Sequence, residues 1–61
     1  MQLLDAPFFT VGEVARILKL NAITIYDYIR TGRLSAVRFG RYYRIAKSDL
    51  LDFLETQKVK L

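Results

Sequence analysis

Residues 10–18 read TVGEVARIL and specify the start of a helix. A threonine followed three residues later by a glutamate is a capping box, in which the Thr10 hydroxyl and the Glu13 carboxylate satisfy otherwise unpaired backbone amides. Apolar residues then recur at helical spacing, while the glycine and the basic residues point away from them. This pattern predicts a first helix over residues 11–19.

A second helix start follows within a few residues. Asn21 is a good N-cap, and Gly32 suits the left-handed position that commonly ends a helix. The apolar stripe between them consists of Ala22, Ile25, Tyr28 and Ile29. A second helix is therefore expected over residues 22–31, and two short helices joined by a tight turn form a helix-turn-helix candidate.

The next stretch, residues 36–45, alternates apolar and basic residues around a glycine, which predicts a β-hairpin. A two-residue turn at 40–41 would pair Phe39 with Tyr42. A three-residue loop at 40–42 would pair Phe39 with Tyr43 and gather every large apolar side chain on one face. Because register follows the buried face, the three-residue loop is the favoured prediction.

That register sets Arg38 directly opposite Arg44 on the exposed face, with Arg41 at the tip of the hairpin. Like charges that face each other destabilise a strand pair. A small domain has little reason to carry that cost unless an anion binds there, so the pattern favours an anion-binding surface over a merely solvated one.

A third helix is predicted to open at Ser48 and Asp49, because acidic residues are favourable at the positive end of the helix dipole. Its buried stripe consists of Leu50, Phe53 and Leu54, and its outer face of Asp49, Asp52 and Glu55. The hairpin is thus basic and this helix acidic on its outside. Residues 57–61 lose the pattern and are expected to fray.

Composition excludes several classes of function. The chain has 61 residues, with neither cysteine nor histidine, so it offers no disulfide, no thiol nucleophile and no Cys/His zinc site. The closest pair of carboxylates, Asp49 and Asp52, lies on a polar helix face rather than in a cleft, no serine has a histidine partner, and the three glycines are too scattered to cradle a phosphate. We therefore expect no enzyme, no metal and no cofactor. No apolar run approaches the roughly 20 residues of a membrane span, and we expect a cytoplasmic protein.

The charge is unevenly distributed. The whole chain carries +4, yet the stretch from Arg30 to Lys47 carries six basic residues and no acidic one. Five of those six are arginine, which suits bidentate contacts to phosphate and guanine. On the second helix, Ile23, Tyr26, Asp27 and Arg30 project opposite the buried side, with Thr24 beside them. Such a helix can present these side chains to base edges and phosphates in a major groove.

Asp27 is the unusual member of this set, because phosphates repel a carboxylate. It fits such a surface if it accepts a hydrogen bond from cytosine or pairs with Arg30 three residues later.

These motifs together resemble a known family. They are the Thr-x-x-Glu-x-Ala helix, residues 21–26, Gly32-Arg33-Leu34, the basic Gly-Arg hairpin and the Ser-Asp-Leu start at residues 48–50. In this order and spacing, residues 9–55 resemble the excisionase-type branch of the MerR-like winged helix-turn-helix domains. Asp27 and Ile23 depart from the family pattern, which usually has a basic or small polar residue and a serine or threonine there.

The resemblance implies an α+β, mostly α, winged helix-turn-helix fold that binds double-stranded DNA. The helix at 22–31 would be the recognition helix, and the hairpin would be a wing on phosphate or in the minor groove. The expected DNA-binding residues are Ile23, Thr24, Tyr26, Asp27, Arg30, Arg38, Arg41, Tyr42 and Arg44. Members act as excisionases of phages and mobile elements or as small transcription regulators, which suggests an integrase or RNA polymerase as partner, and self-association on DNA.

The expected organisation is an N-terminal arm over 1–9, the winged domain over 10–56 and a frayed end over 57–61. Two other interpretations stay open. In the first, the chain is a protein-interaction module that docks through its acidic third helix or through the apolar arm of Leu3, Leu4 and Phe8. In the second, it is the DNA-binding fragment of a larger regulator.

Overall fold

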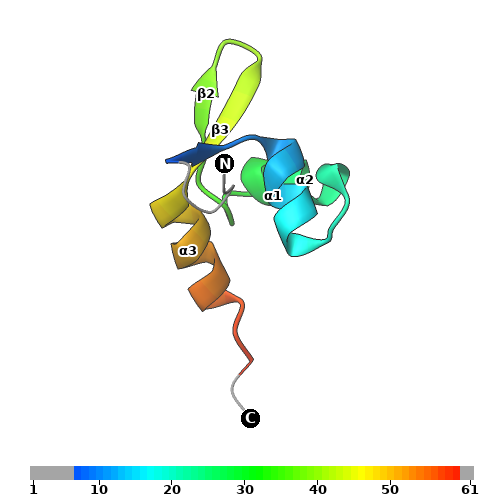
Figure 1. Ribbon diagram of the computed structural model, residues 1–61, viewed down its shortest axis with the longest axis vertical. Helices are drawn as coiled ribbons and strands as arrows, with labels where there is room; N and C mark the ends of the chain where they lie inside the picture. The colour runs from blue at the N-terminus through cyan, green and yellow to red at the C-terminus, as the bar shows by residue number, and fades with distance from the viewer. Residues whose placement is uncertain (1–6, 60–61) are drawn as a thin grey trace.

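The computed structural model describes residues 7–59. Its elements follow the order β1 (Phe8–Phe9), α1 (Val11–Leu18), α2 (Ala22–Arg30), β2 (Val37–Phe39), β3 (Tyr42–Ala46) and α3 (Lys47–Thr56) (Figure 1). Three helices and a small antiparallel sheet confirm the mostly helical α+β class predicted from the sequence. Residues 1–6 and 60–61 fall outside the described part of the chain, as do Leu3 and Leu4 of the expected arm.

The capping box at the start of α1 is present. The backbone amide of Thr10 donates to Glu13 Oε1 at 2.8 Å, and the amide of Glu13 donates to Thr10 Oγ1 at 3.0 Å. The helix ends at Leu18, one residue before the predicted end, because Lys19 adopts the left-handed conformation with φ 57°. Local capping signals therefore fix both ends of this helix.

The second helix also begins where its cap predicts. The side chain of Asn21 accepts a hydrogen bond from the amide of Ile23 at 2.8 Å. The helix ends at Arg30 rather than residue 31, and Gly32 has the positive φ of 80° expected of a residue that reverses the chain after a helix. The turn between α1 and α2 brings the two helices side by side (Figure 1).

The hairpin forms, but with the register that the sequence analysis did not favour. Phe39 pairs with Tyr42, and Arg38 pairs with Tyr43, so the turn consists of the two residues Gly40 and Arg41. Gly40 has φ 62°, which a type II′ turn requires at its first loop position. The expected three-residue loop is wrong.

The reason lies in what the hairpin covers. The predicted register assumed a buried face for all of its apolar residues, but Val37 and Phe39 remain 42% and 56% exposed, and only Ile45 is fully buried. The hairpin projects beyond the core (Figure 1), so the turn rather than burial sets its register. In consequence Arg38 and Arg44 do not face each other, and the expected pair of opposed arginines is also wrong.

A third strand joins the sheet at its base. Phe8 and Phe9 form β1, which pairs antiparallel with β3 through Phe8 and Ala46 and through Phe9 and Ile45, giving the strand order β1-β3-β2. The sequence analysis expected only the two-stranded hairpin. Two residues are too few to show strand periodicity, so this strand depends on its non-local partner.

The third helix begins earlier than predicted. It starts at Lys47, and its N-cap Ala46 supplies no side-chain hydrogen bond, so Ser48 lies inside the first turn. The amide of Lys47 instead donates to the carbonyl of Pro7 at 3.0 Å. A backbone acceptor from the N-terminal segment thus replaces the expected side-chain cap.

The core draws on every element except β2. Its buried residues are Phe9, Val11, Val14, Ala15, Ile25, Leu34, Ile45, Leu50 and Phe53. Phe9, Val14, Ile25 and Ile45 are completely inaccessible to solvent. Of the predicted stripe on the third helix, Leu50 and Phe53 are buried and Leu54 packs against them half-buried. Within the described residues, no helix combines the length and the apolar character needed to cross a membrane.

Two glycines provide a matched test of this backbone. Gly32→Ala should lower the free energy of unfolding by about 1–2 kcal/mol, because alanine is strained at φ 80° although no atom lies within 4 Å of the added methyl group. Gly12→Ala should raise it by up to about 1 kcal/mol, because Gly12 lies in the first turn of a helix. Urea unfolding followed by circular dichroism measures both, and equal effects of the same sign would contradict the assigned backbone.

Candidate nucleic-acid interface

The exposed face of α2 carries the side chains that the sequence analysis selected. Ile23 is 75% exposed and Tyr26 is 51% exposed. Asp27 and Arg30 are exposed as well, and Thr24 is half-buried beside them. Because Ile25 is fully buried against the core, its orientation fixes which side of the helix faces solvent. The helix therefore presents one mixed apolar and polar face.

Asp27 and Arg30 form an ion pair on that face. An Arg30 Nη atom donates to Asp27 Oδ1, across the i, i+3 spacing of the helix. Both side chains are at least half exposed, so the pair is solvated and contributes little to stability. Its main effect is electrostatic, because the carboxylate neutralises the only basic residue of α2.

A hollow of about 300 Å³ lies between this helix, the start of α1 and β3. Four of the sequence-selected residues line it, namely Tyr26 from α2 and Arg41, Tyr42 and Arg44 from the hairpin. The other lining residues are Thr10, Val11, Gly12 and Tyr43. The fold thus brings residues that are distant in sequence to one concave surface.

The wall formed by α1 is the N-terminal end of a helix. The capping box uses the amides of Thr10 and Glu13 and leaves the amides of Val11 and Gly12 outside it. The first amides of a helix have no acceptor within the helix, and the helix dipole gives this end a partial positive charge. With two arginines on the opposite wall, the hollow is suited to an anion.

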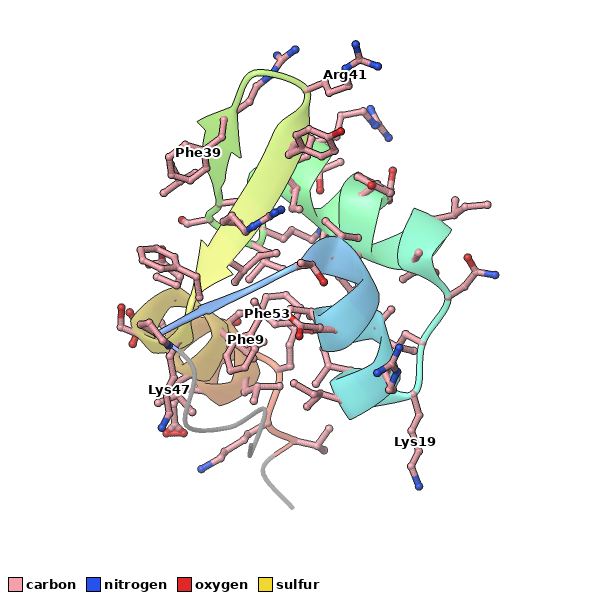
Figure 2. The ribbon with its side chains drawn as sticks, turned by 45° about the horizontal axis from the view of Figure 1, so that its top comes forward. Phe9, Lys19, Phe39, Arg41, Lys47 and Phe53 are labelled. Carbon is pink, nitrogen blue, oxygen red and sulfur yellow. The ribbon has the colours of Figure 1, made fainter. Side chains whose placement is uncertain are left out.

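The arginines of the hairpin are held in different ways. Arg44 donates to the carbonyl of Tyr43 at 2.9 Å, and its guanidinium carbon lies 5.9 Å from the centre of the Tyr42 ring. Arg41 lies at the tip and extends into solvent (Figure 2). Arg44 is therefore positioned by its neighbours, whereas Arg41 is free to adapt.

Arg38 lies apart from the hollow. Its Nε donates to the carbonyl of Gly40 at 2.8 Å, and its guanidinium carbon lies 6.0 Å from the centre of the Tyr43 ring. The Tyr43 ring in turn meets the Tyr26 ring edge-on, with 6.1 Å between their centres. Tyr43 thus links the hairpin to α2, a connection that the sequence analysis missed.

The sequence analysis also missed the contribution of α1. It used Thr10 only as a helix cap and Gly12 only as a residue pointing away from the core. A small residue in the first turn of a capped helix signals a backbone that a ligand can approach closely. That signal is local, but its meaning depends on β3 lying opposite, which the sequence did not reveal. Within residues 7–59, no cluster of three or more Asp, Glu, His or Cys side chains is arranged to hold a metal ion.

Comparison with known families identifies the domain. Residues 8–58 match the family model described as "Helix-turn-helix domain". The chain belongs to this helix-turn-helix family. The matched residues include all six elements of the fold, from the first residue of β1 to beyond the end of α3.

Similar proteins occur in two bacteria. The chain is 40% identical over 47 residues to "Putative DNA-binding protein Rv0500A" and equally to "Putative DNA-binding protein MT0521", both of Mycobacterium tuberculosis, which covers 77% of the chain and 60% of each relative. It is 42% identical over 45 residues to "Uncharacterized protein YvgK" of Bacillus subtilis, covering 74% of the chain but 15% of that relative. The chain thus spans less than two thirds of the length of these relatives. No solved structure matches the chain significantly.

The ion pair on α2 yields a direct test. Asp27→Asn removes the carboxylate and frees Arg30, so duplex DNA affinity at low salt should rise by roughly fivefold, equivalent to about 1 kcal/mol. Fluorescence anisotropy with a labelled duplex measures this. Asp52→Asn on α3 is the matched control, since it removes the same charge outside the helix-turn-helix face and should have a smaller effect. Equal gains from the two variants would mean that only net charge matters.

Proposed function

We propose that this domain binds double-stranded DNA in a sequence-specific manner, with α2 in the major groove and the hairpin along phosphates or in the minor groove. The observation that carries the proposal is the hollow that joins Tyr26 of α2 to Arg41 and Arg44 of the hairpin. A helix face that reads bases is useful only when nearby contacts hold the phosphate backbone in register. The helix-turn-helix family and the names of the two Mycobacterium relatives support the same reading.

Each side of the site has a distinct task in this proposal. Ile23 can contact a thymine methyl group, and Thr24, Tyr26 and Arg30 can donate hydrogen bonds to phosphate or base edges. Arg41, Tyr42 and Arg44 lie along the phosphates together with the α1 amides, and Arg38 adds positive charge on the far side of the hairpin. Asp27 restrains Arg30 or accepts from cytosine N4.

In its biological role the domain serves as an excisionase of a phage or mobile element, or as a small transcription regulator. A single module of this size covers only about 600–1,000 Å² of its own surface on DNA. Its affinity alone is therefore modest, and an integrase, an RNA polymerase or further copies of the same chain would supply the remainder. The chain spans 60% of the length of each Mycobacterium relative. The proposal therefore concerns the role of this domain, also where it forms part of a longer protein.

The second candidate function is a protein-interaction module. Leu51 is 52% exposed on the acidic side of α3, and Phe8 is 47% exposed at the base of the sheet. Exposed apolar residues with charged neighbours are typical of docking surfaces. Such docking would depend on apolar contact, whereas DNA binding would depend on phosphate charge.

A salt titration separates the two candidates. Binding to a random-sequence duplex pool, followed by fluorescence anisotropy, should weaken by an order of magnitude or more between about 50 and 200 mM salt, because bound counterions are released from several phosphates. Absence of binding at tens of micromolar protein in low salt would overturn the DNA-binding proposal and favour a protein partner.

The wing assignment has its own test. Arg41→Ala and Arg44→Ala should each weaken duplex binding and reduce the salt slope by about one unit. Over the fourfold change in salt, the ratio of the two affinities should fall by roughly threefold for each variant. Lys58→Ala removes one positive charge beyond α3 and serves as the control, with an expected change well below that. Wild-type slopes for both hairpin variants would show that the hairpin does not contact phosphate.

A further inference from the structure

The start of α2 exposes a large apolar side chain. Ile23 is the second residue of the helix and is 75% exposed, so it contributes almost nothing to the core. It lies on the same face as Tyr26, three residues later, and Tyr26 lines the hollow that also contains Arg41 and Arg44. A duplex whose phosphates follow the hollow would therefore present its groove to Ile23 on the same side of the helix.

The polar residue next to Ile23 is committed to capping the helix. Asn21 is exposed, and its Oδ1 accepts the amide of Ile23 at 2.8 Å. A bidentate contact to adenine needs both the oxygen and the nitrogen of an asparagine amide. Asn21 cannot make that contact while it caps α2, and this end of the helix offers a base edge the apolar surface of Ile23. The matching apolar group in a major groove is the methyl group on C5 of a pyrimidine, which thymine carries.

One turn further along, the ion pair of Asp27 and Arg30 supplies polar groups. Ile23 and Asp27 are neighbours at i, i+4 on the helix surface. The ion pair uses Asp27 Oδ1 and one Arg30 Nη atom, so Oδ2 and the other guanidinium N–H groups can bind a base pair. A carboxylate accepts from N4 of cytosine, and an arginine donates to O6 and N7 of guanine. The pair therefore fits C·G better than T·A, because O4 of thymine is an acceptor and repels a carboxylate.

We propose that α2 recognises the C5-methyl group of a pyrimidine next to the amino group of a cytosine. This inference rests on the proposed DNA binding and names the base groups that the same face of α2 selects. The methyl group has two possible sources. In 5-methylcytosine, the methyl and amino groups are attached to adjacent ring atoms of one base. In unmodified DNA, the methyl group belongs to a thymine in the base pair beside the cytosine.

The experiment starts from the sequence that the domain itself prefers. Selection from a random-sequence duplex pool gives that site, and duplexes are then synthesised with one base changed at a time. Replacing a thymine by uracil removes only the methyl group, and replacing a cytosine by 5-methylcytosine adds only a methyl group. Neither change alters base pairing. Fluorescence anisotropy then measures the Kd of each duplex.

The two sources give different results. With thymine as the source, one replacement by uracil should weaken wild-type binding by about fourfold, because one methyl-sized group leaves the contact. With 5-methylcytosine as the source, one added methyl group should strengthen binding by a similar factor. In either case, Ile23→Ala should bind the forms of that duplex with and without the methyl group equally well.

Two further variants complete the test. Leu51→Ala removes an apolar side chain that is 52% exposed on α3, so it is the matched control and should keep the full methyl effect. Ile23→Val shortens the side chain by one carbon and should keep part of the effect. Ile23→Ala itself should unfold at the wild-type temperature, since the side chain is exposed and alanine favours a helix.

The amino group has a separate test. Replacing the selected C·G pair by T·A should weaken wild-type binding by about tenfold. The same replacement should cost Asp27→Asn less, because an amide can donate to O4 of thymine where a carboxylate cannot. An equal loss for both proteins would show that Asp27 does not read the cytosine.

Several results would overturn the inference. A site where no methyl substitution changes the Kd, or a methyl effect that persists in Ile23→Ala, would remove the contact while leaving DNA binding intact. Enrichment of no site would overturn the inference together with the sequence specificity of the proposed function, while binding to phosphates remained. Failure of wild type to bind the random pool at low salt would instead contradict DNA binding itself.

Discussion

The pairing of β1 with β3 is the interaction on which the remaining structure depends. Phe9 and Ile45 face each other across these strands, and both are fully buried. Since the cap of α1 follows Phe9 by one residue, the pairing sets the start of that helix beside β3 and so creates the hollow. It also positions the carbonyl of Pro7 to accept the amide of Lys47, from which α3 begins. One short backbone ladder and one further backbone hydrogen bond thus position the hollow and the third helix together.

The features that could be predicted from the sequence are those set by interactions between residues close together in the chain. The helices at 11–18 and 22–30 agreed to within a residue, because capping boxes, N-caps and apolar spacing act over a few residues. β1 and the cap of α3 depend on contacts between segments more than 30 residues apart, which no local pattern in residues 7–9 reveals. The hairpin register failed for another reason, because the alternation of apolar residues was taken to mean burial on a hairpin that is largely solvated.

The same distinction applies to the candidate site. The exposed residues of α2 were identified correctly because Ile25 and its stripe define the buried side, and the two expected roles of Asp27 included the ion pair with Arg30 that is present. The α1 wall of the hollow could not be predicted, since it needs the β1–β3 pairing. The sequence analysis paired Tyr43 with Phe39, whereas Tyr43 pairs with Arg38. The edge-on contact between the Tyr43 and Tyr26 rings could therefore not be predicted.

The hairpin tip and the start of α1 differ in how closely they are tied to the core. Phe39, Arg41 and Tyr42 are exposed and lie outside the core, so a substitution at the tip should leave the packing around Phe9 undisturbed. Thr10 caps α1 and also lines the hollow, so a substitution there should alter both the stability of the helix and the shape of the hollow. In a domain whose core is this small, side chains of a proposed binding surface are best placed where they do not pack in the core. The basic, aromatic hairpin meets this condition, because it carries Arg38, Arg41 and Arg44 while Ile45 is its only fully buried residue.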